Sequence, residues 1–128
     1  MREATKEEVL NVLFDPRILP LISDKQVDRK DFKLPAECGY YTLSGNEIFI
    51  VHPDGQVHAN ILPEVTCKAD KARSFVRFCF DELGHKRLWA EIPKKYLKIY
   101  CLALRAGFSV YKETDKVNYL EVKFNGIR

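Results

Sequence analysis

Apolar and polar residues change their spacing several times along the chain, and each change marks a predicted element. Thr5 and Glu8 form a capping-box pattern, and apolar residues then recur on one face of a helix over about 5–14. An aspartate followed by a proline can begin a second short helix over about 15–23. Segment 24–37 has mixed charges and no clear period, which is typical of an exposed loop.

From Gly39 onward the spacing alternates as it does in strands, with tight turns at Ser44–Gly45–Asn46 and Pro53–Asp54–Gly55. The turns separate three predicted strands over 40–43, 47–52 and 56–62. Strands joined by such short turns pair as an antiparallel meander.

After Pro63 the spacing becomes helical, and this is the strongest local signal in the chain. One face of the predicted helix holds Ala72, Phe75, Val76, Cys79, Phe80 and Leu83, and Gly84 is placed to end it.

The last third of the chain predicts a strand, a helix and a hairpin. The strand covers 88–92, and the helix ends at Gly107. The hairpin covers 108–113 and 117–124, and closes one edge of the sheet. We expect the inward face of this second helix to be Leu97, Tyr100, Cys101 and Leu104.

Composition supports one folded domain over 1–128. The chain is 46% hydrophobic and 12% aromatic, enough for one core. Met1, Arg2 and Glu3 place charges where a secretory signal would be apolar, and no apolar run is long enough to span a membrane. We therefore expect a cytoplasmic protein without membrane association.

The cysteines and histidines predict neither a metal site nor a disulfide framework, because they lack ligand spacing: Cys38, Cys67, Cys79, Cys101, His52, His58 and His85. The net charge of +3 is too small to indicate nucleic-acid binding. Lys94, Lys98 and Arg105 fall near one helical face without aromatic neighbours, which favours a solvated face over a nucleic-acid surface.

The element order resembles that of the GNAT acetyltransferase superfamily, with Met1–Glu3 as the first strand. Short stretches agree with it: Arg2-Glu3-Ala4-Thr5, Ile61-Leu62-Pro63-Glu64 and Arg105-Ala106-Gly107-Phe108. The resemblance implies an α+β fold, an α/β/α sandwich with a mixed, mainly antiparallel sheet and about four helices. It is closest to small GNAT-like proteins encoded by bacteriophages, through Asp15-Pro16, Ile22-Ser23-Asp24, Val57-His58 and Pro93.

The resemblance also implies a loop that binds the diphosphate of acetyl-CoA at the start of the main helix. Its positions here are Thr66, Cys67, Lys68, Ala69, Asp70 and Lys71. Several depart from the family pattern, because Thr66 replaces the usual arginine or glutamine, Ala69 replaces a glycine and Lys71 replaces the last small residue. Asp70 opposes a phosphate, whereas Lys68 and Lys71 offset it. A cofactor loop and an ordinary helix start capped by Asp70 therefore remain alternatives.

Other cofactor contacts implied by the resemblance are the backbone groups of Asn60, Ile61 and Leu62, toward the pantetheine arm, and Tyr96 at the start of the last helix. The available bases are His58 and Glu64, with a structural histidine as the alternative for His58. The usual acid position is occupied by Ala103. Tyr100 lies nearly one turn earlier, where either an acid role or core packing is compatible with its spacing.

Two functions follow from these observations. The first is an acyl-CoA-dependent N-acyltransferase that acts on an amine of a protein or small molecule. The second is a catalytically inactive phage protein with the GNAT fold, in the host cytoplasm or associated with the virion. Such a protein would bind a protein partner in virion assembly or host takeover. The sequence does not predict the acceptor or the oligomeric state.

Overall fold

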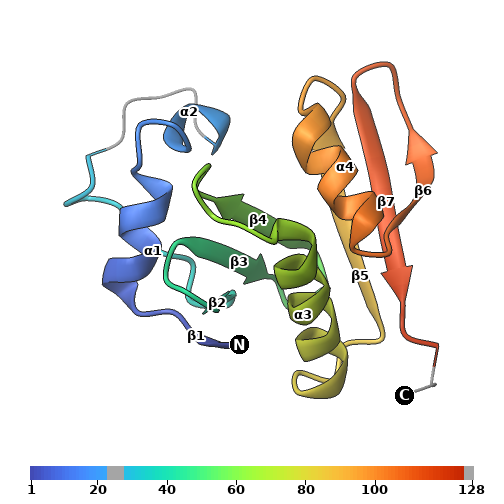
Figure 1. The fold of residues 1–128 in the computed structure, drawn as a ribbon, viewed down its shortest axis with the longest axis horizontal. Coiled ribbons are helices and arrows are strands. Elements are labelled where there is room, and N and C mark those ends of the chain that lie inside the picture. The colour runs from blue at the N-terminus through green and yellow to red at the C-terminus, as the bar shows by residue number, and fades with distance from the viewer. Residues whose placement is uncertain (23–27, 126–128) are drawn as a thin grey trace.

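The structure, a computed structural model, describes residues 1–22 and 28–125 (Figure 1). The elements follow the predicted order. The first part contains β1 (Arg2–Glu3), α1 (Lys6–Leu13), α2 (Leu19–Ile22), β2 (Gly39–Thr42), β3 (Glu47–Val51) and β4 (Val57–Ile61). The second part contains α3 (Lys68–Asp81), β5 (Arg87–Pro93), α4 (Leu97–Arg105), β6 (Ser109–Glu113) and β7 (Val117–Lys123).

The strands form two sheets that meet at one point. The first is antiparallel with the order β1-β2-β3-β4, and the second is antiparallel with the order β5-β7-β6. An isolated parallel bridge between Gln56 and Trp89 joins them, and Trp89 N–H donates to the carbonyl of Gly55 at 3.0 Å. Gly55 has a φ of +91°, and a side chain there would collide with the carbonyl of Arg87. The junction therefore depends on a glycine at this position.

Two apolar cores lie on opposite faces of the first sheet. The larger core joins β2, β3, β5 and β7 to α3 and α4, and the ring of Phe75 stacks on that of Phe49 at 4.8 Å. The smaller core packs α1 against β3 through residues such as Val12 and Ile48, both fully buried. The first sheet is thus covered on both faces, as a sandwich requires.

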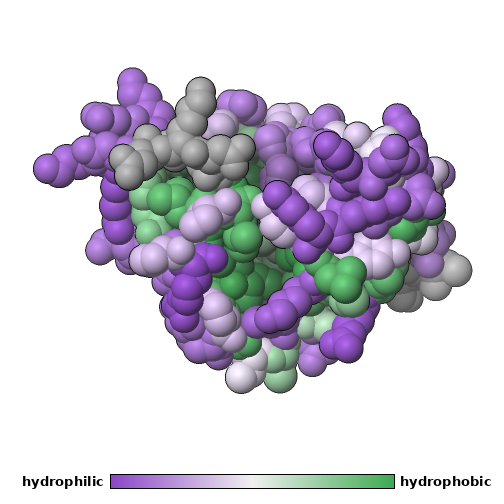
Figure 2. Space-filling view, turned by 90° about the horizontal axis from the view of Figure 1, so that it is seen from above, coloured by the Kyte–Doolittle hydropathy of each residue, from purple (hydrophilic) through white to green (hydrophobic). Residues whose placement is uncertain are grey.

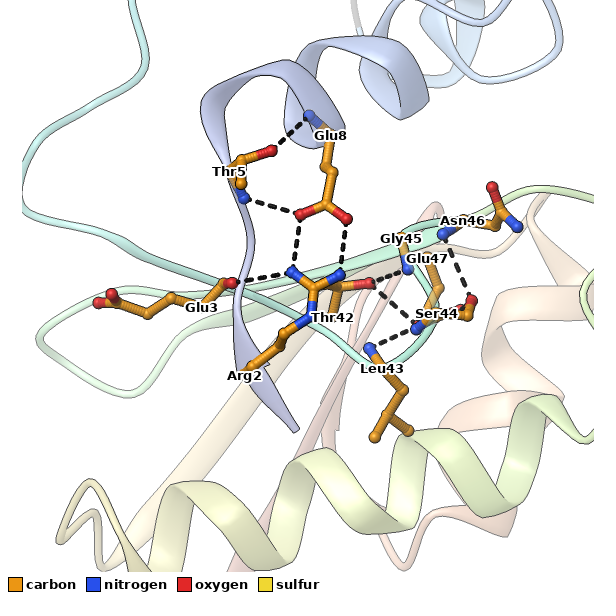
Figure 3. A network of polar contacts seen from close by, with 10 residues as sticks. All are labelled: Arg2, Glu3, Thr5, Glu8, Thr42, Leu43, Ser44, Gly45, Asn46 and Glu47. Carbon is orange, nitrogen blue, oxygen red and sulfur yellow. Dashed lines mark hydrogen bonds and ion pairs between the residues drawn. The ribbon is translucent and has the colours of Figure 1, made fainter.

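Polar contacts fix α1 on the first sheet (Figure 3). Thr5 and Glu8 form the predicted capping box. Arg2 in β1 adds two hydrogen bonds to the Glu8 carboxylate at 2.8 and 2.7 Å. Nearby, buried Glu47 accepts from Thr42 and from the N–H groups of Leu43 and Ser44, which closes the turn between β2 and β3. These contacts hold the start of α1 on β1 and fix the turn between β2 and β3.

Two local predictions are wrong. Helix α2 begins at Leu19, because Asp15 accepts from the N–H of Arg17 and closes a turn before it. The predicted end at Ser23 and part of the predicted loop lie outside the described residues. On α4, the three residues Leu97, Cys101 and Leu104 are exposed. The core contacts instead come from Ile99, Tyr100, Leu102, Ala103 and Ala106.

Candidate functional site

The N-terminus of α3 presents backbone donors that the side chain of its N-cap residue does not bond. Cys67 is the N-cap residue, has left-handed backbone angles (φ 54°, ψ 43°) and makes no side-chain cap hydrogen bond. The N–H of Lys71 bonds to the Cys67 carbonyl at 3.1 Å. The amides of Lys68, Ala69 and Asp70 precede this bond, so they lack helical partners. They lie at the positive end of a 14-residue helix, where an anion is favoured.

Asp70 does not cap α3, so that alternative is wrong. Its carboxylate is 72% exposed and forms an ion pair with Arg73, one turn further along the helix. Arg73 also donates to the carbonyl of Arg105 at 2.8 Å, at the end of α4. Arg73 therefore holds the carboxylate along the helix surface, and the amides of the first turn are not covered by it.

The side chains of two lysines lie beside the N-terminus of α3. Lys68 Nζ lies 3.3 Å from the carbonyl of Pro63, and Lys71 Nζ lies 2.6 Å from the carbonyl of Thr66. Both ammonium groups thus lie over the segment that connects β4 to α3. Together with the helix dipole they offset the charge of Asp70.

A pocket lies beside the segment that connects β4 to α3. This pocket of about 210 Å³ is lined by Ser44, Asn46, Glu64, Val65, Thr66 and Lys71. It lies between the β2–β3 turn and the loop, and two of the predicted loop residues, Thr66 and Lys71, reach it. A second pocket, of about 330 Å³, lies between α1 and β2 and contains none of the predicted site residues.

Strands β4 and β5 separate beyond the Gln56–Trp89 bridge. Figure 1 shows the two strands entering different sheets, with the start of α3 between them. Figure 2, which views the molecule from above Figure 1, shows apolar atoms lining a hollow at the centre of this face, with hydrophilic side chains on both sides. The two central strands, β4 and β5, therefore diverge.

The open edge of β4 offers different residues from those that the resemblance implies. The N–H of His52 bonds to Gln56 at 2.8 Å and the N–H of Leu62 bonds to Asn46 at 3.1 Å. Antiparallel hydrogen bonding alternates, so the backbone groups of every second residue between these two bonds point toward β3. This includes Asn60, whereas Ala59 and Ile61 direct their backbone groups toward the gap.

The predicted backbone role therefore stays a prediction for Ile61, whose groups face the gap, and is wrong for Asn60 and Leu62. The carbonyl of Leu62 is also engaged, because it accepts from the N–H of Val65 at 3.0 Å. Ala59 was not predicted as a site residue, although the alternation of a hairpin strand identifies it.

His58 lies on the face of β4 that is turned toward α1, and its side chain is exposed. Its Nε2 lies 3.1 Å from Nε2 of His52, which follows β3. Contact with the surrounding protein lowers the pKa of His58, and the neighbouring His52 lowers it further. Glu91, on β5 across the gap, partly opposes both effects. A histidine with a lowered pKa is neutral at pH 7 and can accept a proton.

Glu64 is engaged elsewhere. Arg17 contacts both of its carboxylate oxygens, at 2.9 and 3.2 Å, and this contact lowers the pKa of Glu64. A carboxylate stabilised by a guanidinium is a weaker base. The structure therefore favours His58 over Glu64 as the base.

Tyr100 and Tyr96 both pack against the larger core. Tyr100 is partly buried on the inner face of α4, which favours the core-packing alternative over the acid role. Tyr96 is the N-cap residue of α4 without a side-chain cap bond, and Nζ of Lys95 lies over its ring, 5.2 Å from the centroid. Tyr96 stays a predicted cofactor contact.

Cys38, His52 and Glu91 were not predicted as site residues. The predicted hairpin pairs strands 47–52 and 56–62, and this pairing already brings His52 near His58. No group of three or more potential metal ligands is found among residues 1–22 and 28–125. Within the same residues, no helix is long and apolar enough to cross a membrane.

No protein-family model matches the sequence, and no curated protein is detectably similar to it. The structure, however, resembles solved acetyltransferases. It superposes on AAC(6')-Ib in complex with paromomycin and acetyl-CoA with a TM-score of 0.75, at 12% identity over 95% of this chain and 91% of that chain. For an acetyltransferase (GNAT family) from Bacillus anthracis, the TM-score is 0.73 at 13% identity over 95% and 92%.

A third likeness is the Campylobacter jejuni N-acetyltransferase PseH in complex with acetyl coenzyme A. Its TM-score is 0.60 at 14% identity, over 70% of each chain. At these identities the likenesses establish the fold and no more. They confirm the predicted α+β fold of the GNAT type.

Proposed function

We propose that this chain, which has the fold of the GNAT acetyltransferases, is an acyl-CoA-dependent N-acyltransferase that acts on an amine of a protein or small molecule. The observation that carries the proposal is the uncapped N-terminus of α3 beside the open edge of β4. This arrangement combines an anion-binding helix terminus with unused strand groups, and a CoA thioester has a diphosphate and an amide-containing arm that match them.

The residues present fit this cofactor. The amides of Lys68, Ala69 and Asp70 would hold the diphosphate, with the ammonium groups of Lys68 and Lys71 nearby. The backbone of Ala59 and Ile61 would bond the pantetheine arm along the gap. When bound, the cofactor supplies an activated acyl thioester. The departures of this loop from the family pattern change its side chains, but the backbone donors are retained.

His58 would act as the base. An acceptor amine is protonated at neutral pH and must lose a proton before it attacks a carbonyl carbon. The lowered pKa keeps His58 unprotonated at pH 7, so the imidazole can take that proton. The exposed carboxylate of Glu91 lies near His58 across the gap, and we propose that it attracts the cationic amine.

Thermal unfolding with added acetyl-CoA tests the proposal. A ligand that binds only the folded state at 100 times its Kd stabilises it by about 2.7 kcal/mol. We expect acetyl-CoA to raise the Tm of the wild-type chain. The double variant Lys68→Ala/Lys71→Ala should respond much less, because it removes both cations from the loop.

The matched control is Lys6→Ala/Lys33→Ala, which removes the same charge from the pocket between α1 and β2. This variant should respond to acetyl-CoA as the wild type does. An unchanged Tm of the wild type at millimolar acetyl-CoA would contradict the proposed function. An equal loss of response in both double variants would show that only net charge matters, and would contradict the assigned loop.

A binding or assembly role without catalysis is a second candidate, which includes the phage-related alternative. The observation that favours it is the exposed apolar stripe on α4, where Leu97 is 64% and Leu104 is 43% exposed. Acetyl transfer to an amine that is abolished in His58→Gln would contradict this candidate. A folded chain whose Tm does not change with acetyl-CoA would favour this binding or assembly role.

A further inference from the structure

Three side chains from separate segments form a continuous hydrogen-bonded chain beside the proposed base. Sγ of Cys38, just before β2, lies 3.3 Å from Nδ1 of His52. Nε2 of His52 lies 3.1 Å from Nε2 of His58 in β4. The two rings meet edge to face, with centroids 5.1 Å apart and an interplanar angle of 64°. Each nitrogen of His52 is therefore engaged by a different partner.

The contact between the two Nε2 atoms restricts where hydrogens can lie. Two N–H groups facing each other would repel, and two lone pairs would leave no hydrogen bond, so one hydrogen lies between the rings. If His52 donates it, neutral His58 carries its other hydrogen on Nδ1 and has no lone pair available. If His58 donates it, Nδ1 of His58 is unprotonated and can accept a proton. The state of His52 thus decides whether His58 can act as a base.

Cys38 determines which arrangement His52 adopts. Burial raises the pKa of the Cys38 thiol, and the charges of Glu37 and Asp54 raise it further, so the sulfur keeps its hydrogen. The thiol can donate to Nδ1 of His52, or turn toward its other side-chain partner, Tyr40. When it turns away, Nδ1–H of His52 can point toward sulfur, and Nε2 of His52 can accept from His58.

We infer that His52, held by Cys38, is a positioning residue that shares one proton with His58 and sets which nitrogen of His58 is available. The inference rests on the proposed function. During transfer, the ammonium group of the acceptor would give one proton to Nδ1 of His58. The proton on Nε2 would then move to His52, and the pair would release one proton to water. No electron transfer or further reactant is needed for this step.

The charged groups around the pair fit this role. His58 faces His52 from the end of β3 and Glu91 from β5. Cys38 faces Tyr40, Glu37 and Asp54. A carboxylate opposite His58 stabilises the additional proton that the pair holds during transfer.

Nuclear magnetic resonance of the imidazole nitrogens tests the inference without any acyl transfer. We expect the rings of His52 and His58 to titrate as a coupled pair in the wild type. In His52→Asn the pKa of His58 should rise, because a neighbour that lowers it is gone. In Cys38→Ala the tautomer populations of His52 should change. His85, on the loop before β5, serves as the reference ring in every variant.

Acyl transfer provides the second measurement, with a lysine peptide, a polyamine and an aminosugar as amine probes. We expect His52→Asn to lower kcat by roughly tenfold, to move the acidic limb of the pH profile upward, and to leave the KM for acetyl-CoA unchanged. An unchanged pH profile would overturn the inference, as would independent titration of the two rings. A chain that shows the coupled titration but does not respond to acetyl-CoA contradicts the proposed function instead.

Discussion

Asp70 and Arg73 form an ion pair along the surface of α3, three residues apart. The pair holds a carboxylate beside the amides of the first helical turn without letting it bond to them. Arg73 is itself anchored to the carbonyl of Arg105, so α4 takes part in holding that carboxylate. The charge of Asp70 still reaches the anion site, whereas its oxygens do not occupy it.

Substitution of Asp70 by asparagine should therefore have opposite effects on binding and stability. Removing a negative charge near the diphosphate should tighten acetyl-CoA binding by about three- to tenfold. The same change removes a favourable charge from the N-terminus of α3 and should slightly lower the Tm of the chain without ligand. Calorimetric titration and thermal unfolding of Asp70→Asn measure the two effects.

Glu82, at the other end of α3, provides the control for this charge change. Glu82→Gln also removes one negative charge but lies a full helix away from the site. Its affinity for acetyl-CoA should equal that of the wild type. Weaker binding in Asp70→Asn would show that the carboxylate helps to hold the cofactor, contrary to the assignment above.

The open edge of β4 predicts a specific pattern of amide hydrogen exchange. Without ligand, the amides of Ala59 and Ile61 should exchange faster than those of His58 and Asn60, which bond to β3. Saturating acetyl-CoA should slow the amide hydrogen exchange of Ala59 and Ile61 by at least about tenfold, because these amides would then bond to the pantetheine arm. Exchange that slows equally at all four amides would indicate general tightening and contradict an edge-specific contact.

The ion pair between Arg2 and Glu8 predicts a loss of stability in acid. The hydrogen bonds from Arg2, followed by that from the Thr5 N–H, lower the pKa of Glu8 to about 2. A carboxyl group whose pKa is lowered in the folded state stabilises that state above its ordinary pKa. The stabilisation disappears as the pH falls from its ordinary value toward 2.

The Tm of the wild type should therefore fall as the pH decreases from 5 to 2. In Glu8→Gln the Tm should be lower at pH 7, and its dependence on pH over this range should be weaker. Glu7→Gln, which alters an exposed carboxylate on the same helix, is the control and should keep the slope of the wild type. Equal slopes in all three proteins would contradict the role of Glu8.

Much of the fold could be predicted because local signals agree with the tertiary structure. The capping box at Thr5 and Glu8 and the single apolar face of α3 each specify one element without reference to the rest of the chain. The glycines at 45, 55, 84 and 107 all have positive φ, and each follows a predicted strand or helix. These positions depend on neighbours in sequence, so a sequence pattern can identify them.

The candidate site was less predictable, because it depends on contacts between distant segments. The left-handed conformation of Cys67 has no side-chain signature, since glycine or asparagine is the usual residue there. The contact of His52 with Cys38 requires the end of β3 to be paired with the start of β2. Of the residues that the resemblance assigned to the pantetheine arm, Asn60 and Leu62 direct their backbone groups elsewhere, because hydrogen-bonding direction alternates along β4 and the N–H and carbonyl of Leu62 are both bonded.

The buried face of α4 could not be predicted from the spacing of its apolar residues. The exposure of Leu97, which was expected to be buried, can be tested by mutation. Apolar residues surround this helix, so two different faces fit a helical period equally well. Leu97 lies on the face that was expected to be buried, and its side chain is 64% exposed. Leu88, in β5, is completely buried in the larger core. Leu88→Ala should therefore lower the free energy of unfolding by about 2–5 kcal/mol. Leu97→Ala should change it by less than about 0.5 kcal/mol. Both variants remove the same atoms, so urea unfolding compares the two environments directly. A large decrease in the free energy of unfolding of Leu97→Ala would mean that α4 turns Leu97 toward the core, as first expected.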